Sequence, residues 1–396
     1  MTKIMNYTIE DIVAQADRAI NMNERVRNTS FTPNLDKTPP LFNGNQITAL
    51  CKIERNTFNR RLAKGDLPGG ILSKTGRREF TLAEARVWAR AYGRSYVRQD
   101  GQEGVAITVA NSKGGVGKTT TAMCLAQGLN LLGYRVLVVD LDPQGSLSSL
   151  CGYLPDTQVE EWQTVLPFCA GSYNFTGDED ATPVSVTSLD YAIRPTYWDG
   201  LDAITSAPSA FAAEFCIPTR ALQEEGFKFY EVIKNGIDEI KQKYDVIIFD
   251  CPPTMSYLTI GAAWASDGLI IPVPPRGMDF SATAQFWSLF TNLARTIADS
   301  PVAKKDKQKE WQFINVLLSM VDGADERTGF MQRLINDTYG SMVVPVEIPK
   351  TQVLSGTAAD YKTVYDLSKY QGLAKPAYDR VVDLLEQQIR SCWKDS

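Results

Sequence analysis

The sequence contains no histidine among its 396 residues. This absence excludes Ser-His-Asp hydrolysis, histidine metal sites and histidine acid–base catalysis. Long apolar runs are also missing, and no stretch is long enough to span a membrane. The seven cysteines are scattered without a CxxC or a metal-ligand spacing, which predicts reduced core residues in a reducing cytoplasm. The first residues lack a signal-peptide core, so we expect a cytoplasmic protein.

Charge is distributed unevenly along the chain. Residues 41–98 carry twelve Lys or Arg and four Asp or Glu, a net charge of +8, whereas the whole chain carries −5, which leaves −13 for the remainder. A basic module on an acidic body predicts that the module binds nucleic acid. The length and the hydrophobic content of 44% are those of a globular protein with more than one domain.

A phosphate-binding loop, Lys113–Thr120, follows the apolar β-type stretch 105–110 and opens a helical pattern. Strand, glycine loop and helix form the context that this motif requires. The glycines allow backbone N–H groups to close around a polyphosphate, and the helix N-terminus adds partial positive charge. Lys118 is expected to reach the β- and γ-phosphates, and the Thr119 hydroxyl to ligate Mg²⁺. The expected nucleotide contacts are Gly114, Gly115, Val116, Gly117, Lys118, Thr119 and Thr120.

The loop departs from the usual GxxxxGK[ST] pattern, because Ser112 replaces the first glycine and Lys113 is an additional lysine. A cation at Lys113 can cross to a nucleotide in a facing subunit and act as an arginine finger does. The alternative is a solvated loop lysine. With both lysines, the chain resembles the ParA/MinD family of deviant-Walker ATPases, whose pattern is KGGxGK[ST]. The resemblance implies ATP and Mg²⁺ as cofactors, a homodimer, and a doubly wound, mostly parallel α/β sheet.

Two further apolar segments end in acidic residues. Residues 134–145 contain Asp140 and Asp142, and residues 244–253 contain Asp250. Ligands of open α/β sheets bind at the carboxyl ends of strands, where these side chains are expected. The resemblance assigns Asp142 to positioning the attacking water, Asp140 to supporting the metal site, and Asp250 to holding Mg²⁺ through water.

The resemblance continues toward the C-terminus. Residues 268–275 and 313–322 are predicted to be strands. Residues 343–350 and a loop with Leu354 and Ser355 are similar to the adenine-side segment of the family. This similarity implies that Met320 and Pro349 contact the base, and ordinary packing is the alternative for both.

The basic segment has the pattern of a winged helix-turn-helix. Helices are predicted over 45–51, 56–62 and 82–92, and a hairpin over 71–81 turns at Thr75-Gly76. The module resembles the winged helix of the long ParA proteins of plasmids. The candidates for base contacts are Asn56, Asn59, Arg60 and Arg61, and those for phosphate contacts are Lys74, Arg77 and Arg78. A solvated basic face on a packing domain is the alternative.

Amphipathic patterns occur at both ends of the chain. The apolar residues of 9–26 have helical spacing, and a linker follows at 30–40. The resemblance implies that this helix assists dimerisation, and packing against its own domain is the alternative. The C-terminal pattern over 381–393 would bind membranes in a MinD-like protein. Its acidic residues instead favour packing on the ATPase core.

The predicted organisation has three parts: a helix and linker over residues 1–40, a winged module over 41–98 and an ATPase domain over 99–396. The resemblance implies a plasmid-partition ATPase whose ATP dimer binds nucleoid DNA without sequence preference. It also implies stimulation by a centromere-bound, ParB-type partner and repression of the protein's own operon. The alternative is a nucleotide-regulated transcription repressor without a transport role.

Overall fold

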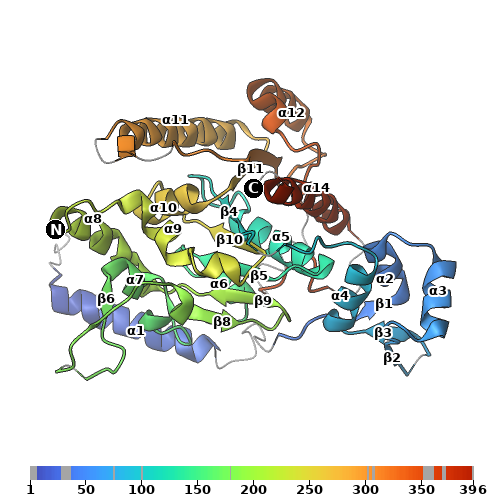
Figure 1. The fold of residues 1–396 in the computed structure, drawn as a ribbon. Coiled ribbons are helices and arrows are strands. Elements are labelled where there is room, and N and C mark those ends of the chain that lie inside the picture. The colour runs from blue at the N-terminus through green and yellow to red at the C-terminus, as the bar shows by residue number, and fades with distance from the viewer. Residues whose placement is uncertain are drawn as a thin grey trace, which may run out of the picture.

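The computed structural model describes residues 7–27, 37–74, 76–99, 101–178, 180–300, 303–305, 308–350, 361–367 and 372–394. A seven-stranded sheet with the order β12-β11-β4-β10-β5-β9-β8 forms the centre of the larger part of the chain (Figure 1). Neighbouring strands are parallel except for β8, which is antiparallel to β9. The strands are β4 (Val105–Val109), β5 (Val136–Asp140), β8 (Ile193–Pro195), β9 (Leu201–Ile204), β10 (Val246–Asp250), β11 (Gly268–Val273) and β12 (Phe313–Leu318).

Both faces of this sheet are covered by helices. In β10, Val246 and Ile248 belong to one hydrophobic core, and Ile247 and Phe249 belong to the other. The first core is closed by α5 (Lys118–Leu132) and α14 (Ala374–Lys394), the second by α10 (Tyr257–Ala265) and α11 (Gly277–Asp299). The other elements are α6 (Ser146–Leu150), α7 (Leu166–Ala170), α8 (Ala213–Gln223), α9 (Val232–Ile237), α12 (Glu326–Tyr339) and the hairpin of β6 (Ser172–Tyr173) and β7 (Val184–Ser185). The predicted α/β fold is thus confirmed.

The basic segment forms a smaller unit at one end of the molecule (Figure 1). It consists of α2 (Gly44–Cys51), α3 (Arg55–Lys64), α4 (Leu82–Ala91) and a sheet of order β1-β3-β2. Strand β3 (Arg78–Phe80) pairs with β2 (Ile71–Leu72), as predicted for the hairpin. It also pairs with β1 (Phe42–Asn43), a strand that the sequence analysis did not predict. Phe58, Phe80 and Trp88 form its buried aromatic centre. Capping boxes at Asn43 and Thr81 begin α2 and α4.

The two terminal helices have different environments. In α1 (Ile9–Arg27), the side chains of Ile9, Ile12 and Ile20 are 76%, 64% and 59% exposed, so the described chain does not cover their apolar face. In α14, Val382, Ile389 and the other apolar side chains of its inner face are buried, which confirms the predicted packing of this helix on the ATPase core. Within the described ranges, no helix has the length and hydropathy that a membrane span requires.

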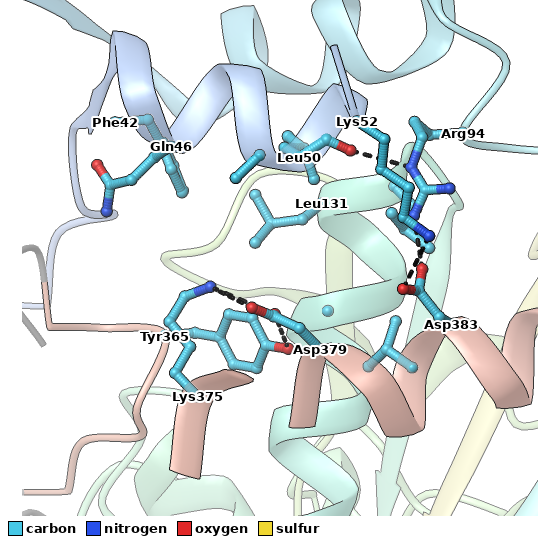
Figure 2. A pocket seen from close by; sticks show the side chains of 14 residues that line it. Phe42, Gln46, Leu50, Lys52, Arg94, Leu131, Tyr365, Lys375, Asp379 and Asp383 are labelled. Atoms are coloured by element: carbon cyan, nitrogen blue, oxygen red, sulfur yellow. Dashed lines mark hydrogen bonds and ion pairs between the residues drawn. The ribbon is translucent and has the colours of Figure 1, made fainter. Parts of the chain in front are cut away.

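One carboxylate fastens the smaller unit to the C-terminal helix (Figure 2). Arg94 donates to Asp383 Oδ1 at 2.6 Å and to the Leu50 carbonyl oxygen at 2.9 Å. The ammonium of Lys52 lies 3.0 Å from the other oxygen of Asp383. A cavity of about 160 Å³ remains beneath these contacts, between α2, α5 and α14. Helix α4 also packs against α5, so the helix that begins at the phosphate loop touches the basic unit directly.

We expect Trp88→Ala to open the smaller unit and leave the ATPase core folded. Trp88 is fully buried against Phe58 and Phe80, and removing a buried indole costs about 3–5 kcal/mol. Native-state hydrogen exchange measures the free energy of opening of α2–α4 separately from that of the sheet. Val87→Ala, at an exposed neighbour, is the control and should change this energy by less than about 0.5 kcal/mol. Unchanged exchange in Trp88→Ala would contradict the described packing.

Candidate functional site

The loop between β4 and α5 lines open space. Gly115 and Gly117 have φ values of +71° and +88°, a region that favours glycine. Apart from the adjacent residues in the chain, no heavy atom of the described residues lies within 4 Å of the position that a Cβ would take at Gly114, Gly115 or Gly117. The backbone of the loop is therefore accessible to a ligand, as the sequence predicts for a phosphate cradle.

Two side chains that the sequence analysis missed form hydrogen bonds with the backbone of this loop. Ser319, directly after β12, donates its hydroxyl to the Val116 carbonyl oxygen at 2.9 Å. Asn111 accepts from the Lys113 N–H at 3.2 Å and donates to the Pro272 carbonyl oxygen at 2.8 Å. Because Ser and Asn are common in loops, neither residue gives a signal that sequence alone could have used.

Both lysines of the motif belong to the same loop. Lys118 begins α5, and its buried ammonium donates to the Lys113 carbonyl oxygen at 3.0 Å. Burial lowers the pKa of Lys118, while the carboxylates of Asp250 and Asp142 oppose this shift. Lys113 and the hydroxyl-bearing Thr119 are half-buried, as is Thr120. Lys118 is therefore a fixed cation at the end of the loop, where α5 begins, and Lys113 is a second lysine at the start of the loop.

Asp250 ends β10 and lies in register with Val109 of β4 and Asp140 of β5. It is fully buried, and neither carboxylate oxygen accepts a hydrogen bond from any described residue. Burial, followed by the nearby Asp140 carboxylate, raises the pKa of Asp250 well above its usual value, whereas the Thr119 hydroxyl and Lys118 lower it. A buried carboxylate without a donor requires a counter-ion or water. Its oxygens and the Thr119 hydroxyl are of the type that Mg²⁺ prefers.

Asp140 has a different environment from Asp250. Its Oδ1 accepts from the Asp142 N–H at 3.1 Å, and its Oδ2 accepts from the backbone and hydroxyl of Ser148 at 2.8 and 2.7 Å. Burial raises the pKa of Asp140 to about 7. The carboxylate therefore orders the loop that carries the half-buried Asp142. Ser148, which also accepts from the Ser206 N–H at 2.8 Å, is a supporting residue that the sequence analysis missed.

The predicted base-side residues lie at the end of β12. Met320 has φ of +51°, and a parallel bridge joins the next residue, Val321, to Pro349. Because Ser319, the residue before Met320, forms a hydrogen bond with the phosphate loop, Met320 and Pro349 lie at the same edge of the sheet as this loop. The loop with Leu354 and Ser355, which resembles the adenine-side segment of the family, lies outside the described residues.

Most of the DNA-binding candidates are exposed on the smaller unit. Asn56, Asn59 and Arg60 of α3 are exposed, whereas Phe58 of the same helix is buried. Arg61 instead lies 3.3 Å from Asp66 and over the ring of Tyr92, 5.7 Å from its centroid. The remaining candidates are at the β2–β3 hairpin and are exposed: Lys74, Arg77 and Arg78.

The chain is similar in sequence and in fold to known proteins. The model of a family described as "AAA domain" matches residues 104–301. "Putative replication protein A" of Sinorhizobium fredii is 30% identical over 369 residues, which cover 90% of this chain and 86% of that protein. SopA of Escherichia coli K12 is 28% identical over 338 residues, which cover 81% of this chain and 79% of SopA.

The chain belongs to the ParA/SopA family of partition ATPases. A solved partition protein that is 17% identical covers 96% of this chain and 99% of its own length with a TM-score of 0.63, so the fold is shared along nearly the whole chain. The predicted resemblance and the predicted ATPase class are confirmed. In this ParA/SopA protein, the family motif occupies the carboxyl ends of β4, β5 and β10.

Ser148→Ala is expected to destabilise the ATPase core by about 1–3 kcal/mol, because Asp140 loses a donor and the Ser206 N–H loses its acceptor. The measurement is urea denaturation followed by circular dichroism. Ser146→Ala, at the exposed first residue of the same helix, is the matched control and should stay within about 0.5 kcal/mol of the parent. Equal midpoints for Ser148→Ala and the parent would contradict the assigned network.

Proposed function

We propose that this chain is a plasmid-partition ATPase that binds ATP and Mg²⁺ at the phosphate loop and DNA through its basic unit. The observation that carries the proposal is the physical connection between the two parts. Helix α5 begins with Lys118 at the phosphate loop and packs against α4 of the basic unit. A displacement of the phosphate loop can therefore be transmitted to the basic unit through α5.

The phosphate loop supplies the nucleotide contacts in this proposal. The backbone from Gly114 to Thr120, including Val116, surrounds the phosphates, and the Lys118 ammonium contacts the β- and γ-phosphates. Thr119 and Asp250 would hold Mg²⁺, which when bound neutralises phosphate charge. Asp142 positions the attacking water. Asp140 supports the metal site and orders the loop that carries Asp142. Met320 and Pro349 contact the adenine, a role supported by their place beside the loop.

A homodimer completes the site. Lys113 crosses to the nucleotide of a second copy and stabilises the charge that develops during hydrolysis. The exposed apolar face of α1 supports an additional contact between copies, since the described chain leaves it uncovered.

The unit over residues 41–98 acts as a winged helix-turn-helix domain. Helix α3 would enter the major groove and present Asn56, Asn59 and Arg60 to base edges. Lys74, Arg77 and Arg78 of the wing would bind phosphates. Arg61 belongs to the same proposed set, although it has to leave Asp66 before it reaches a base.

The domains of the proposal are the N-terminal helix and linker (1–40), the winged domain (41–98) and the ATPase domain (99–396). The ATP dimer binds nucleoid DNA without sequence preference in the cytoplasm. A ParB-type partner stimulates hydrolysis and releases the DNA, and the winged domain represses the protein's own operon. The second candidate, a nucleotide-regulated repressor without transport, is favoured by the same exposed basic face of α3.

A gel-shift titration separates these candidates. The DNAs are the region upstream of the protein's own operon and a scrambled duplex of equal length, each tested without nucleotide and with ADP, ATP or a non-hydrolysable ATP analogue. We expect operator preference with ADP and sequence-independent binding with ATP. Lys113→Ala should abolish only the ATP-dependent mode, and Arg60→Ala should weaken operator binding by about 1–3 kcal/mol.

The control is Lys243→Ala, which removes a surface lysine paired with Asp190 and should behave as the parent does. Operator binding in every nucleotide state, with no ATP-dependent mode, would contradict the partition proposal and leave the repressor.

A further inference from the structure

A second cavity lies at the opposite end of the strands from the phosphate loop. Its volume is about 470 Å³, within the range of small-molecule sites, roughly 300–1,000 Å³. It is bounded by the end of α10, the last turns of α11, and the segment that leads into β12. Because β11 has six residues, about 20 Å of strand separates this cavity from the nucleotide edge.

Aromatic rings form one side of the cavity. Trp264 lies edge to face with Trp311, with ring centroids 5.9 Å apart, and tilts against Tyr230 at 5.4 Å. The indole N–H of Trp311 donates to the Ala263 carbonyl oxygen at 2.8 Å, which fixes the orientation of this ring. Both tryptophans are only half-buried. A fixed but accessible aromatic cluster is suited to a flat ligand.

Three cations also line the cavity. Arg295 and Lys304 are exposed and make no ion pair with any described residue. Lys309 is half-buried, donates to the Ser266 carbonyl oxygen at 2.6 Å and lies 5.5 Å from the centroid of Trp311. Within the described chain its ammonium has no carboxylate at ion-pair distance, and burial lowers its pKa to about 8. Among the described residues, none of these three cations therefore has a carboxylate at ion-pair distance, although the more distant Asp267 carboxylate attracts Lys309.

The acidic residue of the lining does not supply that partner. Glu231 lies 3.3 Å from Lys228, outside the cavity lining. The dipole at the C-terminal end of α11 attracts cations, but it accounts for neither the two half-exposed tryptophans nor the space beside them. An anion with a flat apolar part accounts for all three features.

We propose that this cavity binds a small aromatic anion of the nucleoside monophosphate class. We call it the tryptophan pocket and define it by Tyr230, Trp264, Arg295, Lys304, Lys309 and Trp311. The base would stack on the half-exposed Trp264, which buried Tyr230 supports from within the core, and the phosphate would face the three cations. A phosphate monoester carries about −1.5 to −2 charges at pH 7, and the guanidinium of Arg295 offers the paired donors that bind it best.

The test is equilibrium dialysis of UMP and GMP against the full-length protein with ADP and Mg²⁺ saturating the phosphate loop. We expect binding of at least one of them, with uridine or guanosine and ribose 5-phosphate binding at least about tenfold more weakly, since each lacks one half of the ligand. Trp264→Ala should weaken binding by about five- to hundredfold and Arg295→Gln by about tenfold.

Matched controls distinguish this site from general effects. Trp162→Ala removes an exposed tryptophan and Arg333→Gln an exposed arginine, both outside the pocket, and neither should change UMP or GMP binding. ADP affinity at the phosphate loop should be equal in the two pocket variants and the two control variants, which verifies that they are folded and keeps this test separate from the proposed partition function.

Three results would overturn the proposal. The first is no binding of either monophosphate at millimolar concentration. The second is binding that Trp264→Ala and Arg295→Gln leave unchanged, or that Lys118→Ala abolishes, which would place the ligand elsewhere. The third is binding of a ten-residue oligothymidylate, sensitive to both pocket variants, without any monophosphate binding, which would indicate a surface for nucleic-acid strands.

Discussion

Two fully buried carboxylates, Asp140 and Asp250, lie side by side at the carboxyl ends of adjacent parallel strands, and this arrangement constrains the whole ATPase core. Buried charges of the same sign repel each other and lose hydration. The two carboxylates differ in their hydrogen-bond partners. Asp140 is satisfied by hydrogen bonds from its own loop, whereas Asp250 has no hydrogen-bond donor among the described residues. Both oxygens of Asp250 can therefore contact an ion or an ordered water.

The same constraint fixes the helix that follows the phosphate loop. The Asp250 carboxylate attracts the buried ammonium of Lys118, and Lys118 begins α5, so a shift of the start of α5 would weaken this attraction. Further along α5, a side chain at Gly128 would meet Val382 of α14 at 2.5 Å, which shows how closely the two helices approach. At its far end, the carbonyl oxygen of Gly133 accepts from Arg90 of the basic unit at 2.7 Å. One helix therefore connects the charged site, the C-terminal helix and the basic unit.

The sequence predicts local features well, because the determinants of each lie within a few residues. The glycine loop, the strands that end in Asp140 and Asp250, and the helix pair before the hairpin are of this kind. Long-range determinants are not predictable in this way. Ser148, Ser319 and the two-residue strand β1 acquire their roles only from distant partners.

Lys37 illustrates the same limit of sequence reasoning. It falls at the end of the predicted linker, yet its side chain is buried, donates to the Leu150 carbonyl oxygen at 2.6 Å and lies 3.9 Å from Asp366. Partners more than a hundred residues away in the chain decide these contacts. The exposed face of α1 is the converse case, since the helix was predictable but what covers it was not.

The most direct test of this account is the Mg²⁺ dependence of ADP affinity, measured by calorimetry for the parent and for Asp250→Asn. If the buried carboxylate of Asp250 helps to hold the ion, Mg²⁺ should tighten ADP binding in the parent and have little effect in Asp250→Asn, while Mg²⁺-free affinities remain similar. An equal Mg²⁺ effect in both proteins would contradict the account, because the unpaired carboxylate would then have no part in binding the ion.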